Sequence, residues 1–89
     1  MTAITNYIAP TASDLAKLKS ELGYTGAQMA ELASVSSNSQ WRKYTCGENP
    51  RPVSLHILFF TAAQLTLDKE ELGKVLTKMK EIGAEFKGL

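Results

Sequence analysis

The side chains best suited to chemistry lie close together between residues 36 and 51. Asn38, Gln40 and Arg42 can each form two hydrogen bonds with one base edge, the amides with adenine and the guanidinium group with guanine. Lys43 and Arg51 are cations of the type that binds phosphate groups. This combination favours a surface that contacts nucleic acid, and the competing interpretation is an ordinary polar surface turn.

The distribution of charge is more informative than the total. Ten Lys and Arg residues stand against nine Asp and Glu residues, so the net charge is only +1. Residues 36–56 contain three cations, Arg42, Lys43 and Arg51, and one acid, Glu48, which gives +2 there and −1 elsewhere. The local excess favours an anionic partner, although the balanced total is also typical of ordinary scatter on a protein surface.

Few residues are suited to catalysis or metal binding. The single cysteine, Cys46, and the single histidine, His56, have no further ligand at metal-binding spacing. We expect Cys46 to be a passive thiol, because it falls near the C-terminal end of a helix. No nucleophile with a base, carboxylate pair or glycine-rich phosphate loop is recognisable. The sequence therefore predicts that the protein is not an enzyme and has no catalytic residue, metal, cofactor or small-molecule substrate.

Length and composition are those of one small domain. A chain of 89 residues with 44% hydrophobic residues fits a single domain over 1–89. No stretch approaches the roughly 20 apolar residues of a membrane span, and no basic segment followed by an apolar run opens the chain. We expect a cytoplasmic protein in a reducing environment, with no membrane partner.

Two helices are predicted after an N-terminal arm over 1–10. The first has a capping box, Thr11 with Asp14, and a stop at Gly23. Three leucines repeat on one face of it: Leu15, Leu18 and Leu22. The second begins at a capping box of Thr25 with Gln28 and continues as far as residue 35. From the arm, two apolar side chains can pack across the helices: Tyr7 and Ile8.

A short third helix is predicted after a polar turn. Ser36, Ser37, Asn38 and Ser39 interrupt the apolar period, because such side chains compete with the helical backbone. Ser37 with Gln40 has capping-box spacing, so a helix can begin near Asn38 and end at Gly47. Two aromatic side chains at i and i+3 would face inward and hold it: Trp41 and Tyr44.

Two longer helices complete a compact all-α, five-helix architecture around one core. Pro50 and Pro52 stiffen the connector before the fourth helix, which is apolar on more than one side. Its main face is predicted to be Leu55, Leu58, Phe59, Ala62 and Leu65, with Ile57 and Phe60 pointing elsewhere. The C-terminal helix, 68–87, begins at a capping box of Asp68 with Glu71. Its apolar stripe comprises Leu72, Val75, Leu76, Met79, Ile82 and Phe86, with Met79 as core filler.

Residues 24–60 resemble the helix-turn-helix of phage repressor and Cro-type (lambda-repressor-like) regulators. The stretch "YTGAQMAELASVS" supplies a capping Thr25, Gln28 in the first turn and a small Ala30 where two helices approach. "WRKYTCGE" and "RPVSLHIL" are similar to the segments that follow in that family. Two departures occur: "SSNSQ" is one residue longer than the usual turn, and Ser34 replaces a common glycine.

The resemblance implies a helix-turn-helix over 25–47 whose second helix enters the major groove of DNA. Thr25 and Gln28 would hold phosphate through the N-terminus of the first of the two helices. The residues implied to face DNA are Ser37, Asn38, Ser39, Gln40, Arg42 and Lys43, with Arg51 added as a phosphate contact by its type.

The predicted function is that of a sequence-specific transcription regulator, repressor-like and of phage or mobile-element type, that binds double-stranded DNA. One recognition helix covers about three to five base pairs, so we expect a homodimer on an inverted-repeat operator. Ile57, Phe60 and the apolar stripe of helix 68–87 are the candidate dimer surfaces. The alternative is a protein–protein interaction module on the same scaffold, antitoxin-like or polymerase-binding, which the balanced charge favours.

Overall fold

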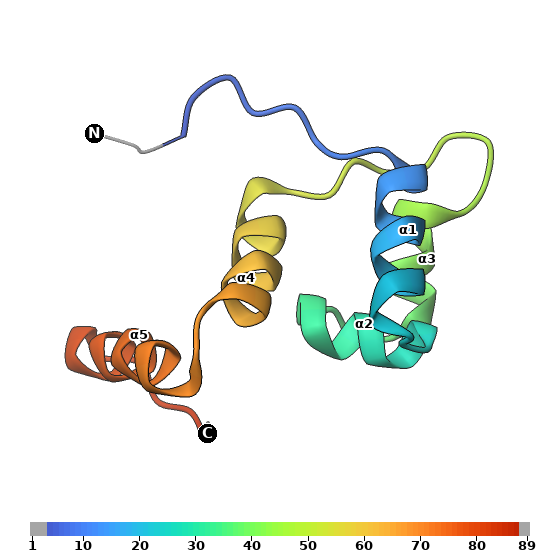
Figure 1. Cartoon of the computed structure of the whole chain (residues 1–89). Helices are drawn as coiled ribbons and strands as arrows, with labels where there is room; N and C mark the ends of the chain where they lie inside the picture. Colours follow the sequence, from blue (N-terminus) through green and yellow to red (C-terminus); the bar gives the residue numbers. More distant parts are fainter. Residues whose placement is uncertain (1–3, 88–89) are drawn as a thin grey trace.

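The computed structural model describes residues 4–87 and confirms the all-α, five-helix architecture (Figure 1). No strand occurs between residues 4 and 87. Residues 1–3 of the predicted arm lie outside the described residues, as do residues 88 and 89. The helices are α1 (Ala12–Leu22), α2 (Gly26–Ala33), α3 (Asn38–Thr45), α4 (Leu55–Thr66) and α5 (Lys69–Ile82).

Each helix begins at a side chain that accepts a hydrogen bond from the backbone of its first turn. The five capping residues are Thr11, Thr25, Ser37, Ser54 and Asp68. The predicted capping boxes at Thr11 and Thr25 are complete in both directions. Ser37 and Asp68 accept from the third helical residue, but no reciprocal bond forms. These local hydrogen bonds explain why the helix starts could be read from the sequence.

The core lies between α1, α2, α3 and the connector that precedes α4. Its six buried hydrophobic residues are Leu15, Met29, Ala30, Ala33, Trp41 and Val53. Helix α4 packs against this core through Ile57 and Leu58, and the buried Thr61 donates its hydroxyl to the Ile57 carbonyl at 2.8 Å. Gln64 ties α4 to α2 by donating to the Leu32 carbonyl at 2.6 Å. Four helices therefore share one packed unit.

The outward face of α4 differs from the prediction. Ile57 was expected to point away from the core, yet it is half-buried against it. Three residues of the predicted main face are instead exposed: Phe59, which is 64% exposed, Ala62 and Leu65. Phe60 is exposed, as predicted. The sequence could not decide this, because eight of the twelve residues of α4 are apolar and its polar residues do not form one stripe on the solvent side.

Helix α5 does not join the core, so the prediction that all five helices surround it is wrong. None of its residues is buried, Ile82 is 79% exposed, and Met79 is exposed rather than core filler. Figure 1 shows α5 beyond the far end of α4, away from α1, α2 and α3. Only two residues, Leu67 and Asp68, join α4 to α5, and both serve as helix caps. This short, hydrogen-bonded joint directs α5 away from the core.

Two helices end earlier than predicted. Helix α5 stops at Ile82 rather than continuing to residue 87, because Gly83 takes a positive φ of 128°. The Ala84 amide then donates to the Met79 carbonyl. Helix α2 stops at Ala33 because Ser34 adopts the left-handed conformation with φ 59°. A residue with a Cβ rarely takes this conformation, and the only sign of it in the sequence is that Ser34 replaces a common glycine of the family it resembles.

The N-terminal arm is attached to the connector by one hydrogen bond. The Tyr7 hydroxyl donates to the Val53 carbonyl at 2.7 Å, and partial burial raises the pKa of Tyr7. Ile8, which was expected to pack across the helices, is exposed instead. The arm therefore contacts the folded unit through the Tyr7 hydroxyl and through Ala9, which packs against the core.

Candidate nucleic-acid interface

Helix α3 is held in place by the two aromatic side chains identified from the sequence. Trp41 is 3% exposed and belongs to the core, and Tyr44 is half-buried beside it. Their rings meet edge to face, with centroids 6.2 Å apart and an interplanar angle of 69°. The predicted inward face of this helix is confirmed, and the opposite face is available to a partner.

The exposed face of α3 is centred on Ser39 and Lys43. These two residues are four apart and Cys46 follows three later, so all three lie on one side of the helix, and all are exposed. Arg42 is also exposed but lies on the flank that faces α1. Gln40 is half-buried on the other flank, which makes it a rim residue rather than a central one.

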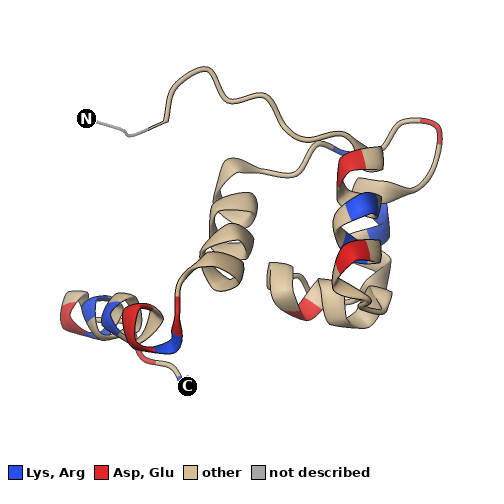
Figure 2. Cartoon of the chain, in the orientation of Figure 1, with Lys and Arg blue, Asp and Glu red and all other residues tan. Residues whose placement is uncertain are grey.

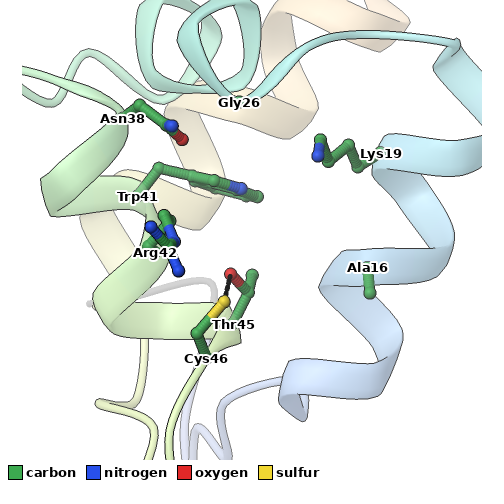
Figure 3. Close-up of a pocket in the computed structure, with 8 residues that line it drawn as sticks. All are labelled: Ala16, Lys19, Gly26, Asn38, Trp41, Arg42, Thr45 and Cys46. Carbon is green, nitrogen blue, oxygen red and sulfur yellow. Dashed lines mark hydrogen bonds between the residues drawn. The ribbon is translucent and has the colours of Figure 1, made fainter.

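A hollow of about 360 Å³ lies between α1 and α3, next to the start of α2 (Figure 3). Lys19 reaches into it from α1, and Arg42, Thr45 and Cys46 line it from α3. Sequence reasoning missed Lys19, because nothing in the pattern of α1 shows which helix its polar side will meet. Two cations at one hollow create a positive potential that attracts an anion.

The start of α3 lies directly against the start of α2. The Asn38 amide occupies the space where a Cβ on residue 26 would lie, so Gly26 allows the close approach. Asn38 nevertheless remains exposed. This contact places the first turn of α3 beside the N-terminus of α2.

The N-terminus of α2 is organised by its capping box. The Thr25 hydroxyl accepts from the Gln28 amide at 3.1 Å, and the Gln28 side-chain oxygen accepts from the Thr25 amide at 2.8 Å. Within residues 4–87 the amides of Gly26 and Ala27 have no acceptor. Unpaired amides at a helix N-terminus attract anions. Gln28 keeps only its side-chain NH₂ group for a ligand.

The cations around α3 are not neutralised by carboxylates. The ion pair found in residues 4–87 joins Lys78 to Glu81, both on α5, at 3.1 Å. Lys19, Arg42 and Lys43 therefore have no acidic partner within the described range, and neither does Arg51. Figure 2 shows charges of both signs on α1 and on α5, whereas α3 carries cations and no acid.

Arg51 is connected to α3 through its backbone. Its amide donates to the Lys43 carbonyl at 2.7 Å, so the connector returns to the last turn of α3. The Arg51 side chain is exposed. The connector therefore brings a third cation to the helix that already carries Arg42 and Lys43.

The fold surrounds Cys46 with groups that the sequence did not reveal. Its pKa is lowered, first by the Thr45 hydroxyl, whose oxygen lies 3.6 Å from Sγ, and then by the Arg42 side chain (Figure 3). Lys19 contributes a smaller electrostatic effect in the same direction. The sequence indicated only the position of Cys46 near a helix end, and not the cations that the fold brings near it. Cys46 therefore reports on the electrostatics of this surface.

Among residues 4–87, no His, Cys, Asp and Glu side chains group in a way that could hold a metal ion. None of the helices there has both the length and the apolar character needed to cross a membrane. Comparisons with protein-family models, curated proteins and solved structures give no match.

Proposed function

We propose that this chain is a sequence-specific, double-stranded DNA-binding regulator of transcription, of the lambda-repressor-like class. One observation carries the proposal. Trp41 and Tyr44 pack helix α3 against the core. Its exposed side carries cations that have no acidic partner within residues 4–87. These cations lie near the unpaired amides at the N-terminus of α2. A helix presented in this way fits the major groove, with α2 against the DNA backbone.

The geometry changes the roles that residue type alone suggested. Ser39 and Lys43 lie at the centre of the exposed face, so we assign them to base edges, with Asn38 at the start of the same helix. Arg42 lies toward Lys19 and α2, so we assign it to phosphate. Arg51, Thr25, Gln28 and the Gly26 amide complete the phosphate contacts, and Ser37 and Gln40 lie at the edge.

The mechanism requires two copies of the chain. One α3 covers too few base pairs to select a site, whereas two recognition helices about 34 Å apart reach successive major grooves of an inverted repeat. Repression then follows from occupation of a promoter. We place such a regulator in the cytoplasm, as is usual for phage-type repressors.

The test is selection of bound sequences from a random duplex pool, followed by titration of the selected duplex at several salt concentrations. We expect an inverted repeat. Three phosphate-binding cations, Lys19, Arg42 and Arg51, should give a slope of log K against log salt of about −2.7 per subunit. Affinity that does not change with salt, or no enrichment of any sequence, would refute the proposal.

A second candidate is a protein–protein interaction module on the same scaffold. The apolar surface formed by α4 and α5 favours it, together with the net charge of only +1. Absence of duplex binding at low salt, combined with a stable protein complex through α4 and α5, would select this function instead.

A further inference from the structure

Cys46 is an exposed thiol in the wall of the hollow between α1 and α3, and the proposed DNA contacts make no use of it. It caps the end of α3, where its amide donates to the Arg42 carbonyl at 2.8 Å. Its Sγ lies 3.6 Å from the Thr45 hydroxyl oxygen and beside the Arg42 side chain (Figure 3). The backbone of α3 therefore fixes this thiol at a cavity that cations also line.

The Trp41 indole supplies an independent feature of the same hollow. Trp41 is 3% exposed, yet its indole N–H makes no hydrogen bond within residues 4–87. Every fully buried polar side-chain atom in that range has a partner, so this N–H reaches the hollow that the indole lines. Figure 3 shows the indole nitrogen toward α1, across the hollow from the backbone of α3. A largely buried donor in this position favours a ligand that carries an acceptor.

The charge and size of the hollow favour a small anion. Its volume of about 360 Å³ falls within the range of about 300–1,000 Å³ that is typical of small-molecule sites. Lys19 lines it from α1 and Arg42 from α3, and none of the eight described residues that line it is acidic. No carboxylate within residues 4–87 pairs with either cation. The ligand best matched to two cations and an indole N–H is a carboxylate or a similar anion.

We propose that Cys46 is a site of reversible mixed-disulfide formation with a small thiol that bears a carboxylate. Lys19, Arg42 and the Trp41 indole N–H hold this carboxylate in the hollow. The co-reactant is the symmetric disulfide of the same thiol. The Cys46 thiolate attacks one sulfur of that disulfide, a new S–S bond forms, and the original S–S bond breaks. The electron pair leaves with the second thiol, which takes up the proton that Cys46 has lost.

The surroundings of Cys46 favour this exchange in two ways. The Thr45 hydroxyl and then Arg42 lower the pKa of Cys46, which raises its thiolate fraction at neutral pH. Lys19 and Arg42 also attract a negatively charged disulfide, and cations at a cleft raise the association rate of an anion by about 10- to 1,000-fold. The same two side chains repel a positively charged disulfide. Selectivity for the charge of the reagent therefore distinguishes a built site from a thiol that is only reactive.

Two disulfides of similar length and opposite charge test the proposal: dithiodipropionate, a dianion, and cystamine, a dication. Their rate constants with the reduced full chain are measured by mass spectrometry, once folded and once unfolded in urea. The unfolded chain gives the intrinsic reactivity ratio of the two reagents. We expect folding to raise the ratio of anion rate to cation rate by at least about 10-fold. An unchanged ratio, or a disulfide between two chains in place of the mixed disulfide, would overturn the proposal.

A matched pair of lysines on α1 tests the geometry. Lys19→Gln removes the cation that faces Cys46 across the hollow, and we expect the rate ratio to fall by about 5-fold or more. Lys17→Gln makes the same change of charge on the same helix, but Lys17 is exposed and does not line the hollow. It should leave the ratio within about 2-fold of wild type. Equal effects of the two variants would show that the overall charge selects the reagent, and would refute the site.

The indole N–H gives a readout that does not depend on rates. Trp41 is the one tryptophan of the chain, so a single indole N–H signal is expected in the nitrogen–proton NMR spectrum. This signal should move when Cys46 carries mercaptopropionate, and move less when Cys46 carries cysteamine. A signal that moves equally with both groups, or with neither, would show that the carboxylate stays outside the hollow.

The consequence for DNA rests on the proposed function. The carboxylate would occupy the two cations assigned to phosphate, Lys19 and Arg42. The modified chain should therefore bind the selected duplex at least about 10-fold more weakly, with a salt slope smaller by about 1.8 per subunit. Charge-selective modification with unchanged duplex affinity would refute this regulation and support the site. Charge-selective modification of a chain that binds no duplex would refute the proposed function alone.

Discussion

Ser34 offers the sharpest test of the backbone argument, because the chain contains a matched glycine. Ser34 ends α2 with φ 59° and ψ 37°, and Gly23 ends α1 with φ 68° and ψ 27°. The two caps make the same pattern of hydrogen bonds, each amide donating to carbonyls three and four residues earlier. Ser34 is exposed, and its side chain makes no hydrogen bond within residues 4–87. Only the Cβ distinguishes the two positions.

The expected effect follows from two opposing terms. A residue with a Cβ costs roughly 1–2 kcal/mol in the left-handed region, and Ser34→Gly removes that cost. Glycine also gives the unfolded chain more conformational freedom, which lowers the free energy of unfolding by about 0.5–1 kcal/mol. We therefore expect Ser34→Gly to raise the free energy of unfolding by about 0.5–1 kcal/mol, or Tm by roughly 2–8 °C.

Urea unfolding followed by circular dichroism measures this change at one fixed protein concentration, since dimerisation would contribute to stability. Gly23→Ser should lose about the same amount, because a Cβ at Gly23 meets no atom within 4 Å and only backbone strain changes. The double variant should return close to wild type. If Gly23→Ser is destabilising while Ser34→Gly has no effect, the strain assigned to Ser34 does not exist.

Three further outcomes are expected. Trp41→Ala should cost about 3–5 kcal/mol of unfolding free energy, measured by urea titration, because it empties the core beneath α3; a smaller loss would place the indole outside the core. Lys43→Ala should cost about 1–3 kcal/mol of binding free energy to the selected duplex and relax the preference at one base pair. Arg42→Ala should weaken binding to all duplexes alike and reduce the salt slope by about 1. The reverse pattern would restore the roles inferred from residue type. Alkylation of Cys46 should show a midpoint below the usual thiol pKa, and Arg42→Ala should move that midpoint upward, since it removes a cation and a hydrogen-bond donor; an unchanged midpoint would contradict this cause.

The sequence was sufficient for features set by neighbours along the chain. Helix starts at Thr11 and Thr25 could be predicted, because a capping side chain bonds to the backbone three residues away. The inward pair on α3 followed from the spacing of Trp41 and Tyr44 together with their apolar character. Ser34 shows the limit of this reasoning, since its left-handed backbone is imposed by the turn and not by its own preference.

Features that depend on how elements meet could not be predicted. The stripe of α5 indicated an apolar face but not what would cover it, and the structure leaves that face outside the core. Lys19 belongs to the candidate site only because α1 passes α3 beside the start of α2. The roles of Arg42 and Lys43 depend on a rotation of 100° per residue around α3, which residue type does not reveal.

Helix α4 has a consequence for evolution of the binding site. It is a 12-residue rod with the core unit at one side and the two-residue joint to α5 at its end. If α5 joins two copies, α4 determines the distance between their two α3 helices and how one is rotated relative to the other. Inserting a single residue in α4 would lengthen the rod by about 1.5 Å and turn its end by about 100°. In the proposed regulator, operator spacing would then be set by the length of α4, to which none of the proposed base contacts belongs.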